Sequence, residues 1–72
     1  MIIGTVKFFD TDKGFGFIGP DAGGKDTFVH ISAVQQAADM ETLCAGERVG
    51  YDIVIDRRGK EIASNLKPMG EL

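Results

Sequence analysis

Among its 72 residues the chain has no tryptophan, one histidine and one cysteine, Cys44. A single cysteine excludes an internal disulfide framework, and one cysteine with one histidine leaves no ligand set for a structural zinc site. No cofactor motif, nucleophile with a base, or paired acid and base can be assembled from the remaining residues. The sequence therefore predicts a protein that is not an enzyme and that has no metal, cofactor or small-molecule substrate.

Long apolar runs are missing as well. No window approaches the roughly 18 apolar residues of a membrane span. The first four residues lack the charged start and long apolar run of a signal peptide. We therefore expect a cytoplasmic protein with no membrane contact. With 43% hydrophobic and 26% charged residues, residues 1–72 are expected to fold as a single domain with a small core.

The chain also lacks an excess of positive charge. Its formal net charge is -3 and its pI is about 4.9. This acidity argues against a nucleic-acid partner, because phosphate neutralisation normally supplies much of the affinity for one. If the chain does bind nucleic acid, we expect weak electrostatics and heavy reliance on stacking. Several cations nevertheless lie near candidate binding strands: Lys7, Lys13, Arg57, Arg58 and Lys60.

Aromatic residues are few but concentrated, since five of the six lie in the first 28 residues. Strand geometry places Phe15 and Phe17 on one side together with Lys13, and Phe28 on the side of His30. Large apolar side chains are usually buried, so a core position for these rings is one interpretation. Flat rings beside cations are also what unstacked nucleic-acid bases bind, and this is our leading hypothesis.

Turns rich in Gly, Asp and Pro divide the chain into short segments of β-forming residues. Phe8 and Phe9 cannot share one face of a regular strand, so either one ring is buried or the strand contains a bulge. A capping box, Ser32 with Gln35, predicts one or two helical turns after the third strand. The five expected strands are residues 3–10, 15–18, 26–31, 47–56 and 61–66.

The grouping of three strands and two strands, joined by a longer connection, predicts an all-β fold. We expect a five-stranded antiparallel OB-fold β-barrel, with a five-stranded sandwich as the alternative. In the last strand the inward residues are expected to be Ile62 and Leu66, and Pro68 is expected to end the ordered structure. Strict alternation in the fourth strand predicts that four residues share one face: Val49, Tyr51, Ile53 and Ile55.

From Gly4 to Leu66 the chain resembles the bacterial cold-shock domain proteins. The resemblance rests on KGFGFI at residues 13–18 and FVH at residues 28–30, which occur in the family's order and approximate spacing. The first motif is also similar to one in RNA-recognition-motif domains. Their pattern, however, ends in another aromatic residue where this chain has Pro20, and their fold needs two substantial helices. Further matches are GTVK at 4–7, SAVQ at 32–35, and Thr42-Leu43 followed by Gly46.

The resemblance implies a five-stranded β-barrel that binds single-stranded RNA or single-stranded DNA by stacking bases on surface aromatics. It further implies little sequence discrimination, a preference for pyrimidines, and a role as an RNA chaperone. We expect a monomer rather than a dimer. Lys7 and Lys13 would contact phosphates, and His30 would stack on a base or hydrogen-bond to it. Carried over position by position, the binding face would comprise Lys7, Phe8, Phe9, Asp10, Lys13, Phe15, Phe17, Phe28, His30, Ile31, Met40 and Arg58.

Four of these positions depart from the family pattern. Phe8 stands where the family typically has Trp, Asp10 where Asn is usual, Ile31 where Phe is common, and Met40 where an aromatic is common. Each change reduces the stacking surface or adds repulsion toward phosphate. Two other functions therefore stay open: a translation- or ribosome-associated barrel that needs a larger assembly, and a protein-interaction barrel that has lost nucleic-acid binding.

Overall fold

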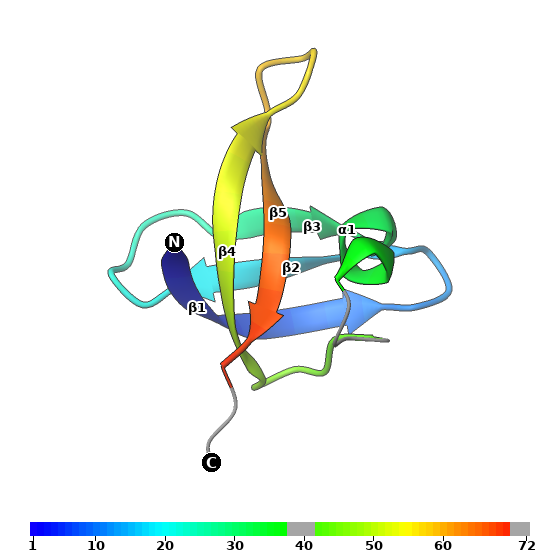
Figure 1. The fold of residues 1–72 in the computed structure, drawn as a ribbon, viewed down its shortest axis with the longest axis vertical. Helices are drawn as coiled ribbons and strands as arrows, with labels where there is room; N and C mark the ends of the chain where they lie inside the picture. The colour runs from blue at the N-terminus through cyan, green and yellow to red at the C-terminus, as the bar shows by residue number, and fades with distance from the viewer. Residues whose placement is uncertain (38–41, 70–72) are drawn as a thin grey trace.

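The computed structural model describes residues 1–37 and 42–69, which form a barrel of five strands with one short helix (Figure 1). The strands close in the order β1-β2-β3-β5-β4. The predicted five-stranded barrel with a helical turn after the third strand is confirmed. Met40 lies outside the described residues. In chain order the elements are β1 (Ile2–Asp10), β2 (Phe15–Pro20), β3 (Thr27–His30), α1 (Ile31–Gln36), β4 (Arg48–Ile55) and β5 (Glu61–Pro68).

The barrel closes through one parallel seam. Four neighbouring strand pairs are antiparallel, whereas β3 and β5 run parallel and meet at Phe28 and Ile62. This seam differs from the antiparallel pairing that we expected. The reason is geometric, because a closed ring with an odd number of strands cannot alternate direction at every step. The consequence is that the last strand lies directly beside Phe28.

The core is formed by inward side chains that alternate with outward ones along the strands. Within this core the hydroxyls of Thr27 and Tyr51 lie 3.3 Å apart. Both residues are buried. Each hydroxyl is the hydrogen-bond partner of the other, so neither is buried without a partner, which would be costly. This contact joins β3 to β4 through the barrel interior. The buried apolar residues are Val6, Ile18, Val29, Val34, Leu43, Val49, Tyr51, Ala63 and Leu66.

The inward face of β5 differs from the prediction. Leu66 is buried as expected, but the other buried residue is Ala63, and Ile62 is only half-buried. Asn65 has a φ of 53°, a left-handed conformation that breaks the two-residue alternation of a strand. The inward positions are therefore three residues apart. β5 also continues to Pro68, which still pairs with β4.

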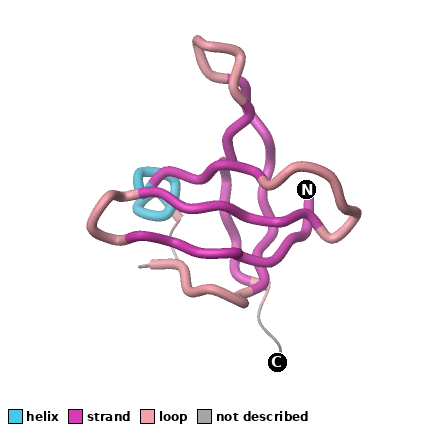
Figure 2. Tube along the Cα trace, turned by 180° about the vertical axis from the view of Figure 1, so that it is seen from behind, coloured by secondary structure: helices cyan, strands magenta, loops and turns pink. Residues whose placement is uncertain are grey.

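The ends of β4 and β5 project from the barrel as a hairpin, residues 54–62, which we call the hairpin arm (Figures 1 and 2). Along β4, Val49 and Tyr51 are buried and Ile53 packs against the core, as predicted. Ile55, expected on the same inward face, is instead 60% exposed. Its neighbour Val54 is exposed as well, because the arm extends beyond the core that would cover these residues.

The helix begins directly after β3, and its N-cap is not the predicted Ser32. The cap is His30, whose backbone is extended at φ -97° and ψ 151°. Its Nδ1 accepts a hydrogen bond from the Ser32 N–H at 3.1 Å. The capping-box prediction is wrong because the N-cap lies two residues earlier than Ser32. The free amide in the first turn is therefore that of Ser32 itself, and the imidazole nitrogen of His30 satisfies it. α1 buries Val34 against the barrel.

Candidate nucleic-acid interface

Four phenylalanine rings from three adjacent strands form one cluster on the outside of the barrel. We call this cluster the ring platform: Phe8 of β1, Phe15 and Phe17 of β2, and Phe28 of β3. Phe8 lies 5.6 Å from Phe17 and 6.1 Å from Phe15, measured between ring centroids. Phe28 lies 5.8 Å from both Phe15 and Phe17. Figure 2 shows the three strands side by side.

Strand alternation and register explain why these rings meet. Phe17 pairs with Phe8 on one side and with Phe28 on the other. The alternate residues Ile18 and Val29 point inward and are fully buried. The four rings are exposed or half-buried, so the structure places them outside the core, and the core interpretation does not hold.

The strand irregularity expected near Phe8 and Phe9 is present. The register of β1 against β2 shifts between Val6 and Phe8. Phe8 is 44% exposed and belongs to the ring platform, whereas Phe9 is partly buried and packs against the core. Both alternatives therefore apply, because the bulge turns Phe8 outward while Phe9 faces inward. Phe9, predicted for the binding face, is not among the platform rings.

A glycine separates the two rings of β2. A Cβ added at Gly16 would collide with the backbone oxygen of Phe8 and lie 2.7 Å from the Phe9 ring. Any larger residue would force β1 and β2 apart. Gly16 thus permits the close strand approach that brings Phe8 beside Phe15 and Phe17.

The turn from β1 to β2 places charges of both signs beside the platform. Oδ1 of Asp10 accepts hydrogen bonds from the backbone N–H groups of Asp12 and Lys13, each at 3.0 Å. The Lys13 side chain is exposed. Lys7, also exposed, has its Nζ 4.0 Å from a carboxylate oxygen of Asp26. Because such an exposed pair is weak, a phosphate can compete for Lys7.

His30 and Ile31 lie where β3 passes into α1. Nδ1 of His30 accepts from the Ser32 N–H and lies 3.0 Å from the Ser32 hydroxyl. A nitrogen that accepts carries no proton, so in the neutral ring the proton lies on Nε2, which remains a donor.

Ile31 is half-buried, and its side chain lies over Gly14 of the preceding turn. Its position is beside the turn rather than among the platform rings.

The hairpin arm contributes a cation that sequence reasoning left out of the site. Nζ of Lys60 lies 4.2 Å from the centroid of the Phe28 ring, within the range of a cation–π contact. Arg58, the predicted residue, is exposed, and its backbone N–H donates to Oδ1 of Asp56. The sequence indicated Lys60 only as one of several cations near the candidate binding strands. Its contact with Phe28 becomes evident only once Ile62 is known to pair with Phe28.

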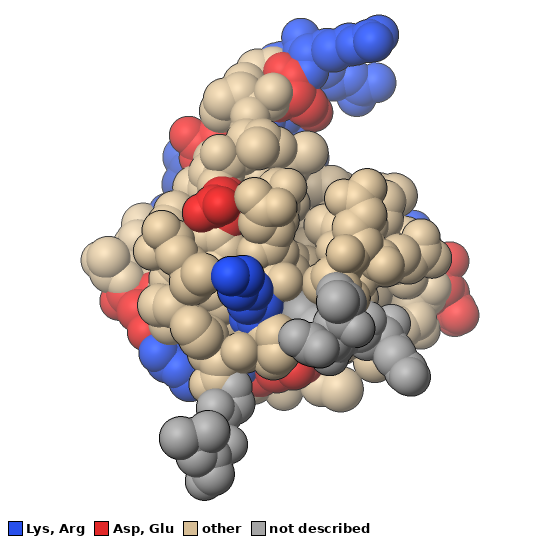
Figure 3. All heavy atoms as spheres, viewed as in Figure 1, with Lys and Arg blue, Asp and Glu red and all other residues tan. Residues whose placement is uncertain are grey.

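The turn of the arm is held by Asp56. Its Oδ1 accepts from the backbone N–H groups of Lys60 at 2.8 Å and Arg58 at 2.9 Å. The hydrogen bond from the Lys60 amide, with that from Arg58 and the charges of both side chains, lowers the pKa of the Asp56 carboxyl below its usual value. The carboxylate therefore stays ionised and fastens the turn that carries the basic tip, which is visible at the top of Figure 3.

A groove of about 560 Å³ lies between the platform and the hairpin arm. Its lining combines two rings of the platform, Phe17 and Phe28, with charges of both signs. An extended chain with flat apolar groups and intermittent charge fits such a surface. The lining residues are Phe17, Lys25, Asp26, Phe28, Gly59, Lys60 and Glu61.

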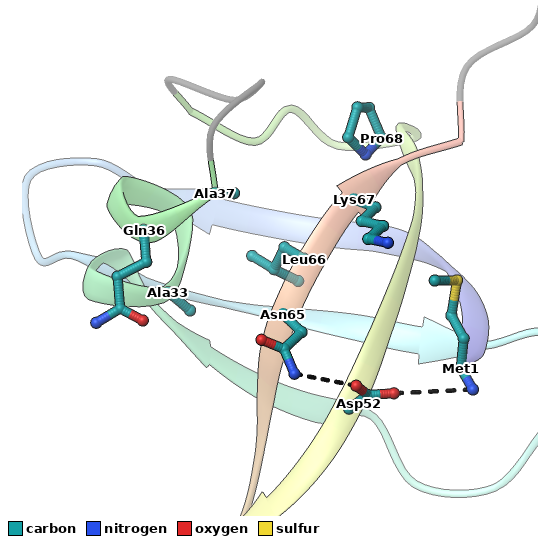
Figure 4. Close-up of a pocket in the computed structure, with 9 residues that line it drawn as sticks. All are labelled: Met1, Ala33, Gln36, Ala37, Asp52, Asn65, Leu66, Lys67 and Pro68. Carbon is teal, nitrogen blue, oxygen red and sulfur yellow. Dashed lines mark hydrogen bonds and ion pairs between the residues drawn. The ribbon is translucent and has the colours of Figure 1, made fainter.

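A larger cavity of about 820 Å³ lies elsewhere, between α1, β5 and the N-terminus (Figure 4). There Asp52 accepts a hydrogen bond from Asn65 at 3.1 Å and lies 3.7 Å from the N-terminal ammonium of Met1. Among the described residues that line this cavity there is no aromatic ring and no predicted binding residue. The candidate interface is therefore the ring platform and its groove.

Within residues 1–37 and 42–69, no three His, Cys, Asp or Glu side chains gather in a way that could hold a metal ion. No helix in those same ranges is long and apolar enough to cross a membrane.

A closed five-stranded barrel with outward aromatic rings on three adjacent strands is a nucleic-acid-binding β-barrel of the OB type. Comparison with known proteins agrees with this class. Residues 2–69 match the model of the 'Cold-shock' DNA-binding domain. The chain belongs to this family, whose members are non-enzymatic nucleic-acid binders. The expectation that it is not an enzyme is thereby confirmed.

Two relatives are similar over nearly their whole length. The chain is 55% identical over 68 residues to "Cold shock protein CspA" of Rhizobium meliloti (strain 1021), covering 93% of this chain and 97% of the relative. It is 46% identical over 63 residues to "Cold shock-like protein CspE" of Escherichia coli (strain K12), covering 88% and 90% respectively.

Proposed function

We propose that the protein binds single-stranded RNA and single-stranded DNA by stacking unpaired bases on the ring platform. The observation that carries this proposal is the meeting of four partly exposed rings, with centroids 5.6 to 6.1 Å apart, on three strands. Stacking requires exposed base faces, which a duplex does not offer. It also tolerates all four bases, so we expect low sequence discrimination.

The charges around the platform support a binding mode in which stacking dominates. Lys7, Lys13 and Lys60 can contact phosphates, while Asp10, Asp26 and Glu61 lie nearby and oppose them. The protein as a whole carries a net charge of -3. A surface that bound a nucleic-acid strand mainly through its phosphates would need an excess of positive charge, which this protein does not have.

Within this function we propose the role of an RNA chaperone that keeps RNA single-stranded. A protein that stacks on unpaired bases stabilises the open form over the paired form by its differential affinity for the two. Low sequence discrimination lets this effect act on many RNAs. We further propose that the protein works as a monomer in the cytoplasm and prefers pyrimidine-rich strands.

The deciding experiment is a titration of the isolated protein with a short oligothymidine at low salt, followed by NMR of the Phe rings. We expect shifts concentrated on Phe8, Phe15, Phe17 and Phe28, and little binding to a duplex of the same length. Equal binding of oligoadenine and oligothymidine would remove only the pyrimidine preference. Absence of binding to any single strand would instead favour a protein-interaction barrel or a factor that needs a larger assembly.

The chaperone role needs its own measurement. An RNA hairpin with a fluorophore and a quencher at its ends should open when the protein is added, because binding traps the unpaired strand. Binding to a single strand without opening of a marginally stable hairpin would separate simple binding from the chaperone role.

A further inference from the structure

The ammonium of Lys60 lies over the ring of Phe28, which the proposed binding mode needs for base stacking. Its Nζ lies 4.2 Å from the centroid of Phe28. Phe15 and Phe17 flank the same ring at 5.8 Å each. Lys60 therefore covers part of the ring surface that these two neighbours leave open, on the side of the groove that it also lines.

A stacked base and this ammonium cannot share that surface. Nonbonded carbon atoms approach to about 3.5 to 4.0 Å, so a base in contact with Phe28 would take the space that Nζ fills. The lysine must move before the base can stack. Its side chain is flexible and carries a compact charge, and the phosphate of the incoming nucleotide is a new partner for that charge.

We propose that Lys60 is a displaceable cover of Phe28, which rests on the ring in the free protein and moves to a phosphate when a base stacks there. This role rests on the single-strand binding proposed above. It makes Lys60 a positioning residue of the interface, placed by the hairpin arm rather than by the strands that carry the rings. Arg58 of the same arm has no such ring contact among the described residues.

The two parts of this role respond differently to salt. Leaving the ring forfeits a cation–π contact, which corresponds to about a two- to fivefold loss of affinity at an exposed site. Gaining a phosphate contact raises affinity at low salt and contributes about 0.7 to the slope of log affinity against log salt on a single strand. Removing the Lys60 charge should therefore weaken binding at low salt and strengthen it at high salt.

The test compares the native protein with Lys60→Gln on one labelled oligothymidine between 50 mM and 1 M salt. We expect the slope for Lys60→Gln to be shallower by about 0.7. We also expect its affinity to lie below the native value at 50 mM and about two- to fivefold above it at 1 M. Lys67→Gln is the matched control, because Lys67 is exposed and lines the separate cavity of Figure 4 instead of the groove. Its slope should equal the native one.

NMR of the free protein provides a second readout. The Lys60 side-chain methylene protons nearest Nζ should be shifted upfield by the Phe28 ring, and Phe28→Leu should abolish the shift. Parallel salt lines for native protein and Lys60→Gln, or weaker binding of the variant at every salt concentration, would overturn the role of Lys60 while leaving single-strand binding intact. Failure of the native protein to bind any single strand would overturn both.

Discussion

Phe15 and Phe28 lie on adjacent strands with ring centroids 5.8 Å apart and ring planes inclined by only 18°. They are not direct partners in the sheet, since Phe15 pairs with His30 and Phe28 pairs with Phe17. The contact is a diagonal one, which long flat side chains can make across a sheet. The two nearly parallel rings offer surfaces of similar orientation, which suits successive bases of one strand in the proposed binding mode.

Phe15→Ala and Phe28→Ala should each weaken single-strand binding by about 1 to 3 kcal/mol, the range for losing one base stack. The free energy of unfolding should change little, because both rings are only half-buried. Oligothymidine titration and denaturant unfolding measure the two quantities. Val29→Ala is the control on the opposite face: Val29 is fully buried, so this change should cost about 2 kcal/mol of stability. A different outcome would contradict this assignment: if a Phe variant is largely unfolded but its folded fraction binds with native affinity, the ring belongs to the core.

Asp10→Asn should tighten binding, most visibly at low ionic strength, where screening is weakest. Asn keeps the oxygen that accepts from the Asp12 and Lys13 amides, so the turn should survive while the repulsion toward phosphate is removed. Salt titrations of the native protein and the variant on the same oligonucleotide measure this.

The native salt slope should itself be shallow, corresponding to two or three phosphates at about 0.7 each. Asp10→Ala separates the two roles of the side chain, because it removes the acceptor as well as the charge and should loosen the turn. A steep native slope would reveal more cationic contacts than the structure suggests. Unchanged or weaker binding by Asp10→Asn would place this carboxylate outside the interface or in a role that needs its charge.

His30→Ala should lower the free energy of unfolding by about 1 kcal/mol, because it removes the N-cap that accepts from the Ser32 amide. His30→Asn should recover most of that loss, since Asn is a favourable N-cap. Both variants lack the imidazole and should bind the oligonucleotide less tightly than the native protein. Denaturant unfolding and titration together separate capping from binding. Equal instability of the Ala and Asn variants would show that packing of the imidazole, not capping, stabilises this junction.

Tyr51→Phe should destabilise the barrel by about 1 to 3 kcal/mol, because it leaves the Thr27 hydroxyl buried without its partner. The double variant Tyr51→Phe with Thr27→Val should cost less than the sum of the two single changes, since no polar group is then left alone. A double-mutant cycle in denaturant measures this coupling. Additive losses would show that the two hydroxyls do not depend on each other, and binding per folded molecule should be unchanged in all three variants.

Much of the ring platform could be predicted because it follows from a local rule. Side chains alternate along a strand, so Phe15 and Phe17 had to share a side whatever the strand paired with. Phe8 and Phe9 could not be resolved in the same way. Which of them faces outward depends on the register shift against β2, and a bulge is a property of two strands together.

The helix cap and the inward face of β5 show the limit of such patterns. The capping box at Ser32 is a valid local signal, but the helix begins at Ile31. His30, which β3 delivers in an extended conformation, is the N-cap and accepts from the Ser32 amide. In β5 the left-handed backbone of Asn65 breaks the alternation of side chains. As a result Ala63, and not Ile62, shares the inward face with Leu66. Neither feature leaves a trace in residue spacing alone.

By itself the sequence determined the family, through the resemblance of its motifs. It also determined the five strands and the side of β2 and β3 on which the rings stand, because turn residues and side-chain alternation act within a few residues. Only the tertiary structure decided that Lys60 lies on Phe28. The physical reason is barrel closure: five strands require one parallel seam, and this seam joins β3 to β5. Two residues far apart in the chain are thereby brought into contact by strand order and register, which no local pattern specifies.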